Sequence, residues 1–106
     1  MNIKPYSYKK ARKSTDMFRV KSEYHLWMAN EMLKKAIKRS CLSGLDYADI
    51  ELTLYTSGFN FDDITQIEVT INDLAAIYFD EGYYTNIKEL MGAEFKIEGY
   101  RLRINW

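Results

Sequence analysis

The sequence predicts an α+β domain in which one long N-terminal helix packs on a small antiparallel sheet. Two further short helices, a C-terminal β-hairpin and a preceding basic arm complete the predicted fold. Residues 22–41 keep apolar side chains on one face of a helix. Residues 49–56 alternate between apolar and polar side chains, as a half-buried strand does. The 106 residues, 47% of them hydrophobic and 28% charged, suffice for one modest core.

The first residues differ from the rest in composition. Residues 1–16 are polar and basic and have no apolar periodicity, so we expect a basic arm that precedes a single domain of residues 17–106. Residues 17–21 alternate apolar and basic side chains, which permits a short strand.

The long helix has recognisable ends. Ser22 is a suitable N-cap, and Gly44 is a suitable stop. Trp27 widens the apolar stripe that we expect to face the sheet. We therefore expect this helix to be the central element of the core.

The middle of the chain predicts a strand pair and two short helices. Residues 64–71 alternate like residues 49–56, and the two segments are predicted to pair. Residues 72–84 fit a short helix that ends near Gly82 better than a strand, although both interpretations stay open. Residues 85–91 are predicted to form another short helix.

The C-terminal segment changes its apolar phase. Apolar side chains occupy odd positions up to Ile97 and even positions from Leu102 onward. A two-residue turn at Gly99 and Tyr100 would explain this change and predicts a hairpin. A β-bulge at Gly99 is the alternative.

Charge is divided between the two parts of the chain. Residues 1–41 hold eleven basic and three acidic side chains, a net charge of +8. Residues 42–106 hold four basic and twelve acidic side chains, a net charge of −8. Such a division is typical of proteins with a charged partner. The alternative is that the two halves neutralise each other within the fold.

The candidate binding residues are cations and neighbouring tyrosines. Tyrosines interleaved with basic residues can stack on bases or anchor a segment on a protein surface. The predicted binding residues are Tyr6, Tyr8, Lys9, Lys10, Arg12, Lys13, Lys34, Lys35, Lys38 and Arg39. A secondary binding face is predicted at Lys96, Arg101 and Arg103.

Catalytic chemistry has little support in the sequence. The single His25 and the single Cys41 lack the usual spacing of zinc ligands, and no glycine-rich phosphate loop is present. Glu94 and Lys96, on the polar face of a predicted strand, match a metal-dependent nuclease only weakly. We therefore expect no catalytic residue, no metal and no cofactor.

The expected function is a small non-enzymatic inhibitor, resembling an anti-CRISPR protein only in general type. Size and a composition typical of AT-rich genes suggest a phage or mobile-element origin. Its expected partner is a larger protein or nucleoprotein complex of host defence that handles nucleic acid, and the arm would compete with that nucleic acid. The alternatives are a directly DNA- or RNA-binding regulator, with residues 85–91 as the recognition helix of a winged helix, and a small nuclease or toxin. A homo-oligomer that pairs basic with acidic halves is a further alternative, and we expect a cytoplasmic location without membrane contact.

Overall fold

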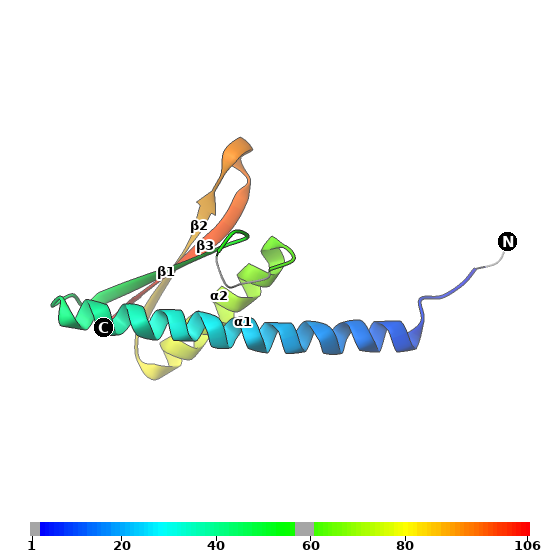
Figure 1. The fold of residues 1–106 in the computed structure, drawn as a ribbon, viewed down its shortest axis with the longest axis horizontal. Coiled ribbons are helices and arrows are strands. Elements are labelled where there is room, and N and C mark those ends of the chain that lie inside the picture. The colour runs from blue at the N-terminus through cyan, green and yellow to red at the C-terminus, as the bar shows by residue number, and fades with distance from the viewer. Residues whose placement is uncertain (1–2, 57–60) are drawn as a thin grey trace.

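The computed structural model describes residues 3–56 and 61–106. Within these ranges two helices, one 3₁₀ turn and three strands follow one another in the order α1, β1, α2, β2, η1, β3 (Figure 1). Their bounds are Tyr8–Leu42 for α1, Tyr47–Thr53 for β1, Ile64–Glu81 for α2, Tyr84–Met91 for β2, Ala93–Phe95 for η1 and Ile97–Asn105 for β3. The predicted α+β class with an antiparallel sheet is confirmed.

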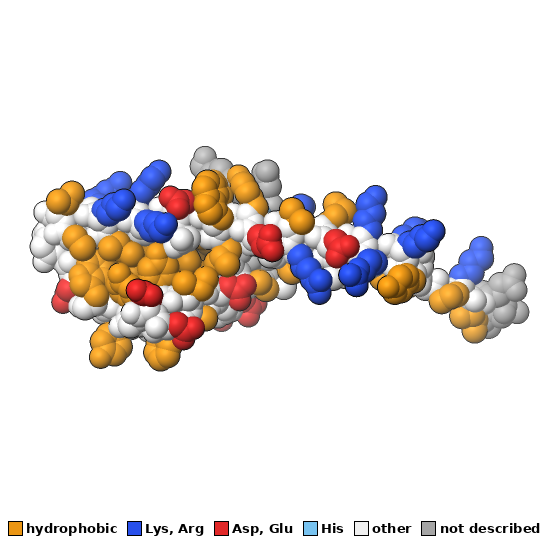
Figure 2. Space-filling model, turned by 90° about the horizontal axis from the view of Figure 1, so that it is seen from below, with side chains coloured by type: hydrophobic (Ala, Val, Ile, Leu, Met, Phe, Trp, Pro, Cys, Tyr) orange, Lys and Arg blue, Asp and Glu red, His pale blue; other side chains and the backbone are white. Residues whose placement is uncertain are grey.

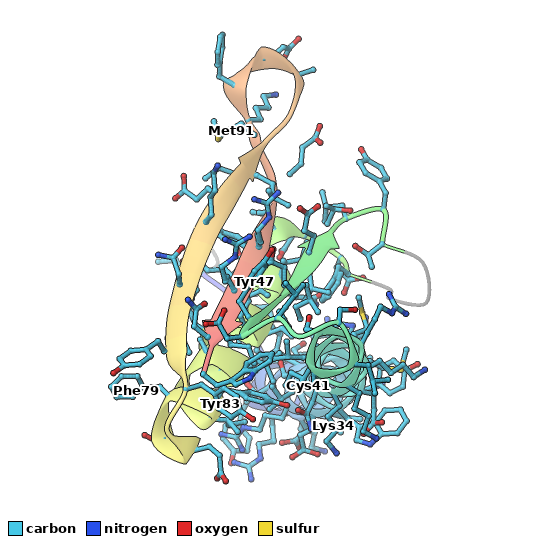
Figure 3. All side chains as sticks on the ribbon, turned by 90° about the vertical axis from the view of Figure 1, so that its left-hand side faces the viewer. Lys34, Cys41, Tyr47, Phe79, Tyr83 and Met91 are labelled. Atoms are coloured by element: carbon cyan, nitrogen blue, oxygen red, sulfur yellow. The ribbon has the colours of Figure 1, made fainter. Side chains whose placement is uncertain are left out.

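The sheet has the order β1-β3-β2, and β3 runs antiparallel to both neighbours. Leu102 lies opposite Ile50 of β1 and Ile87 of β2. The helices cover one face of this sheet: α1 packs on β1 and α2, and α2 packs on β3 and β2. The other face is open and polar. The hairpin of β2 and β3 extends away from the helices, with Met91 near its tip (Figure 3).

The core lies between the sheet and the two helices. Its fully buried side chains include Leu33, Leu52, Ile67, Ile71, Leu74, Leu102 and Ile104. The Tyr78 hydroxyl of α2 donates a hydrogen bond to Asn30 Oδ1 of α1 at 2.7 Å, which joins the helices. Burial raises the pKa of Tyr78, so this hydroxyl stays a donor further into alkaline pH than an ordinary tyrosine does.

Helix α1 begins far earlier than expected. It starts at Tyr8 rather than at Ser22, so the expected arm is helical from Tyr8 and the expected short strand at 17–21 is part of the helix. The buried residues of α1 are His25, Ala29 and Leu33, whereas its N-terminal half extends beyond the body (Figure 1). This extension makes the molecule 68 Å long in its longest dimension. No helix within the described residues combines the length and the apolar character needed to cross a membrane.

The predicted strand at 64–71 is wrong, because these residues form the first turns of α2. Asp63 caps the helix by accepting a hydrogen bond from the Gln66 backbone N–H at 3.1 Å. The Gln66 side chain in turn accepts from the Asp62 backbone N–H at 2.7 Å. These two bonds satisfy backbone donors at the start of the helix. The predicted pairing of 64–71 with 49–56 is therefore also wrong, and β1 pairs with β3.

The helix predicted within residues 72–84 exists as the last part of α2. It ends at Gly82, whose φ of 115° is left-handed and therefore favours glycine. The predicted helix at 85–91 is wrong: these residues belong to β2, an edge strand held by its pairing with β3.

The predicted turn at Gly99 and Tyr100 is wrong, because β3 runs through both residues. The pairing of β2 with β3 shifts register between Leu90, opposite Gly99, and Met91, opposite Ile97. This irregularity leaves Glu98 as an extra residue and accounts for the change of apolar phase. Gly99 also allows close approach of the strands, since a Cβ there would meet the Leu52 carbonyl oxygen.

The anchoring of α1 can be tested at Leu33, which is fully buried. Leu33→Ala should lower the free energy of unfolding by about 2–5 kcal/mol, because it removes buried methyl groups and leaves a cavity. Leu42→Ala, at a side chain 91% exposed on the same helix, is the control. Urea unfolding measures both. A loss below about 1 kcal/mol for Leu33→Ala would contradict this account of the core.

Candidate binding surfaces

The N-terminal half of α1, residues 8–24, forms a rod. Its side chains are exposed except for Ser22, which is half-buried. The rod carries six basic and two acidic side chains. Near its base the Lys21 ammonium pairs with Asp62 Oδ2 at 2.8 Å, and the segment before it extends into solvent (Figure 1). The rod therefore presents a concentrated positive charge away from the body.

The predicted residues of the arm lie on this rod or just before it. Tyr6 precedes the helix, Tyr8 is its first residue, and both side chains are exposed. Arg12 makes a long ion pair with Asp16, at 3.8 Å. Lys9, Lys10 and Lys13 form no ion pair with any carboxylate in the described part of the chain. These cations are therefore available to a partner.

The other predicted cations of α1 lie at its opposite end. Lys34, Lys35, Lys38 and Arg39 belong to the last turns of the helix. At 1.5 Å per residue, Lys35 lies about 37 Å along the axis from Lys10. Lys34 lies on the side of α1 remote from the sheet (Figure 3). The structure therefore separates the predicted basic residues into two clusters on one helix.

An exposed apolar stripe lies between these two clusters, and the sequence did not predict it. Met17, Val20, Tyr24 and Trp27 follow one another at spacings of three and four, and we call them the outer stripe. Their exposed fractions are 55%, 67%, 49% and 58%. With 3.6 residues per turn, the stripe faces almost opposite to the buried side of α1. Trp27 was expected to face the sheet, and that expectation is wrong. Figure 2 shows hydrophobic side chains along the rod and over the body.

Arg101 and Arg103 lie on the open face of the sheet, each held by a carboxylate of β1. Arg101 donates to Glu51 Oε1 at 2.6 and 2.9 Å. Arg103 donates to the two oxygens of Asp49 at 2.7 and 2.8 Å, and its guanidinium lies 4.6 Å from the ring centre of Tyr47. The hydrogen bonds from Arg103 lower the pKa of Asp49.

A shallow hollow of about 210 Å³ opens on this sheet face. Asn86 and Lys88 of β2 line it together with Arg101 and Arg103. The exposed Tyr84 and the half-buried Tyr47 lie in one row across β3, because both pair with Asn105. Asn86 and Lys88 were missed because the sequence predicted a helix here. The face thus combines cations, an amide and two aromatic rings.

Lys96, the third residue of the predicted secondary face, lies elsewhere. It occupies the loop between β2 and β3, where its ammonium is 3.6 Å from Glu94 Oε2 and both side chains are exposed. Glu94 has a φ of 60° and lies in the 3₁₀ turn η1. The weak nuclease hypothesis required Glu94 to lie on a strand, and that expectation is wrong. His25 is buried with its ring 4.5 Å from that of Phe61. Residues 3–56 and 61–106 contain no group of three His, Cys, Asp or Glu side chains placed to hold a metal ion.

The two oppositely charged halves of the chain scarcely pair with each other. Among ion pairs of Lys and Arg with Asp and Glu in the described ranges, Lys21–Asp62 alone joins residues 1–41 to residues 42–106. The other pairs lie within one half. Direct internal pairing therefore leaves most of the basic charge of α1 unmatched.

Comparison of the chain with protein families, with curated proteins and with solved structures finds no match.

The Asp49–Arg103 pair predicts a specific loss of stability in acid. Because the pKa of Asp49 is lowered in the folded protein, the ionised carboxylate stabilises the fold above its ordinary pKa of about 4. That stabilisation disappears as the pH falls through the lowered pKa. Asp49→Asn should therefore reduce stability more at pH 7 than at pH 2.

Urea unfolding of both proteins across this pH range provides the measurement. Asp73→Asn, which alters an exposed carboxylate of α2, controls for the change in net charge. An equal difference between the wild type and Asp49→Asn at both pH values would contradict the role of this pair.

Proposed function

We propose that this chain is a small non-enzymatic binding protein of phage or mobile-element origin. It inhibits a nucleic-acid-handling complex of host defence by placing the rod on an acidic surface of that complex. The observation that carries this proposal is the rod: an exposed helix that leaves the body and holds six cations against two carboxylates. Such a shape can occupy a site that otherwise receives nucleic acid.

The physics of helices supports a partner for the rod. An unpacked helix of this length is only marginally stable in water. An exposed stripe of Met17, Val20, Tyr24 and Trp27 also costs free energy in solvent. A partner that covers the stripe and pairs with the cations would lower both costs. The helical form in turn fixes the cations before binding, which reduces the entropy lost on association.

An acidic protein surface fits the rod better than a nucleic acid does. Helices that enter the major groove contact base edges through residues such as Arg, Asn and Gln. The rod instead carries an apolar stripe beside its cations. A phosphate backbone would leave that stripe exposed to water. The buried position of His25 and the exposed position of Glu94 and Lys96 support a role without catalysis.

Charge reversal on the rod tests the proposal. The variant Lys9→Glu, Lys10→Glu, Arg12→Glu and Lys13→Glu should lose the partner, because attraction to carboxylates becomes repulsion. The fold should persist, since all four side chains are exposed. The measurement is capture from a lysate of the native host, with and without nuclease, at three salt concentrations. Partners are quantified by mass spectrometry, and circular dichroism verifies the fold.

A charge-matched variant serves as the comparison. Reversal of Lys35, Arg39, Lys88 and Lys96 changes net charge equally at exposed side chains outside the rod. Equal loss in both variants would assign the interaction to net charge instead of the rod. Retention of the same partners by the rod variant would refute the proposal. Loss of every partner after nuclease treatment would favour direct nucleic-acid binding.

The open face of the sheet supports a second candidate function, direct binding of single-stranded nucleic acid. Tyr84 and Tyr47 offer rings for base stacking, while Lys88, Arg101 and Arg103 offer donors to phosphates. Asp49 and Glu51 neutralise the two arginines in part, which places this candidate behind the rod.

Oligonucleotide binding tests the second candidate. Tyr84→Ala should weaken binding of a fluorescent single-stranded oligonucleotide by about 1–3 kcal/mol, the usual value of one stacked base. Lys88→Ala should reduce the dependence of binding on salt by about one phosphate contact. Tyr55→Ala, at an exposed tyrosine outside the sheet, is the control. An unchanged oligonucleotide affinity of Tyr84→Ala, measured by fluorescence anisotropy, would exclude this face as the binding site.

A further inference from the structure

The outer stripe belongs to a longer seam along α1 with alternating spacings of three and four. Toward the N-terminus the seam continues to Lys13 and Lys10, and toward the C-terminus to Glu31, Lys34 and Lys38. This spacing is that of the contact positions in a coiled coil. The seam is thus apolar in its centre and has a net positive charge at both ends, where Lys34 also pairs with Glu31 at 3.4 Å.

Two shallow hollows, both open to solvent, lie along the seam. One hollow of about 330 Å³ is lined by Asp16, Met17, Val20 and Lys21. A second, of about 270 Å³, lies where α1 meets α2 and is lined by Glu23, Leu26, Trp27, Asn30 and Ile77. Trp27 belongs both to the outer stripe and to the second hollow. The apolar surface therefore continues from the rod onto α2 at Ile77, whose side chain is half exposed.

We propose, on the basis of the function proposed above, that the seam binds an amphipathic helix of the target protein. The apolar side chains of that helix cover Met17, Val20, Tyr24 and Trp27 in a knobs-into-holes arrangement. Its two ends carry Asp and Glu, which pair with Lys10 and Lys13 at one end of the seam and with Lys34 and Lys38 at the other.

Charge complementarity favours such a helix over a second copy of this chain. A parallel pair of α1 helices would place Lys13 against Lys13 and Lys34 against Lys34. An antiparallel pair centred on the stripe would bring Lys10 against Lys34, and Lys13 against Glu31. Both arrangements would also bring one basic rod onto another basic surface, which costs free energy at low salt. An acid-ended helix meets Lys10, Lys13, Lys34 and Lys38 with opposite charge, and among the seam positions Glu31 alone opposes it.

A synthetic helix tests this inference directly. The probe is a peptide of about four heptads with Leu and Ile at its central contact positions and Glu at its outer ones. A matched peptide carries Lys in place of Glu. Isothermal calorimetry with the full chain at low salt should show binding of the Glu peptide at least about ten-fold tighter than of the Lys peptide.

Variants of the chain identify the surface used. Val20→Ser and Trp27→Ala should each weaken binding of the Glu peptide about ten-fold, as expected for buried contact residues. Phe79→Ala, at a 63% exposed aromatic side chain of α2 outside both hollows, should leave binding within about two-fold. Lys10→Glu with Lys13→Glu should reduce the preference for the Glu peptide, because Lys34 and Lys38 then remain as the cations at the other end of the seam.

Several outcomes separate this inference from the proposed function. In one outcome, the rod variant with charge reversal at residues 9, 10, 12 and 13 loses its partners while Val20→Ser and Trp27→Ala bind the Glu peptide normally. That result would overturn the seam and leave the proposed role of the basic rod standing. If neither the charge reversal nor the two seam substitutions change binding, both the seam and the proposed function are refuted. A dimer in analytical ultracentrifugation that strengthens with salt and is broken by Val20→Ser would assign the seam to a second copy. Binding of anionic vesicles or duplex DNA through the same residues, without binding of the Glu peptide, would also overturn it.

Discussion

The rest of the structure depends on the packing of the C-terminal half of α1 against the sheet and α2. Ala29 and Leu33 are completely buried, and Asn30 accepts a hydrogen bond from Tyr78 on α2. Starting a helix is costly, whereas extending an existing one adds a hydrogen bond for each residue fixed. The packed half therefore supplies the start from which the rod is extended. Residues Lys9 to Lys13, a helix former at every position, then continue the helix at a smaller cost than an isolated helix would incur.

The sequence predicted the elements whose signals are local. The alternation of 49–56 identified β1, and the apolar face of 22–41 identified the anchored half of α1. The start of α2 had a local signal too, since Asp63 and Gln66 have the spacing of a capping box. The alternation over 64–71 is the competing local signal, and it predicts the wrong element. Ile67, Ile71 and Leu74, at spacings of four and three, are all buried on one face of α2.

Other features depend on distant contacts, which a local pattern does not contain. Residues 85–91 include good helix formers, yet pairing with β3 makes them a strand. The basic residues of the rod were found because charge can be counted without a fold. The outer stripe was missed because Met17 and Val20 were placed in a short strand, while Trp27 was placed against the sheet. A helix that continues through residues 17–27 brings these side chains onto one face. Lys88 joined Arg101 and Arg103 only once the strand order was known.

Helix α1 carries basic side chains at both ends of the apolar outer stripe. This arrangement has a measurable consequence for any complex that α1 forms. Attraction by exposed lysines is screened over about 10 Å at 0.1 M salt and over about 3 Å at 1 M. Burial of Met17, Val20 and Trp27 is not screened and is strengthened by salts that are excluded from protein surfaces. The association rate should therefore depend on the cations, while the lifetime of the complex depends on the apolar centre. A complex that dissociates equally slowly at low and high salt would be held by the stripe, and one that dissociates quickly at high salt would be held by the charges.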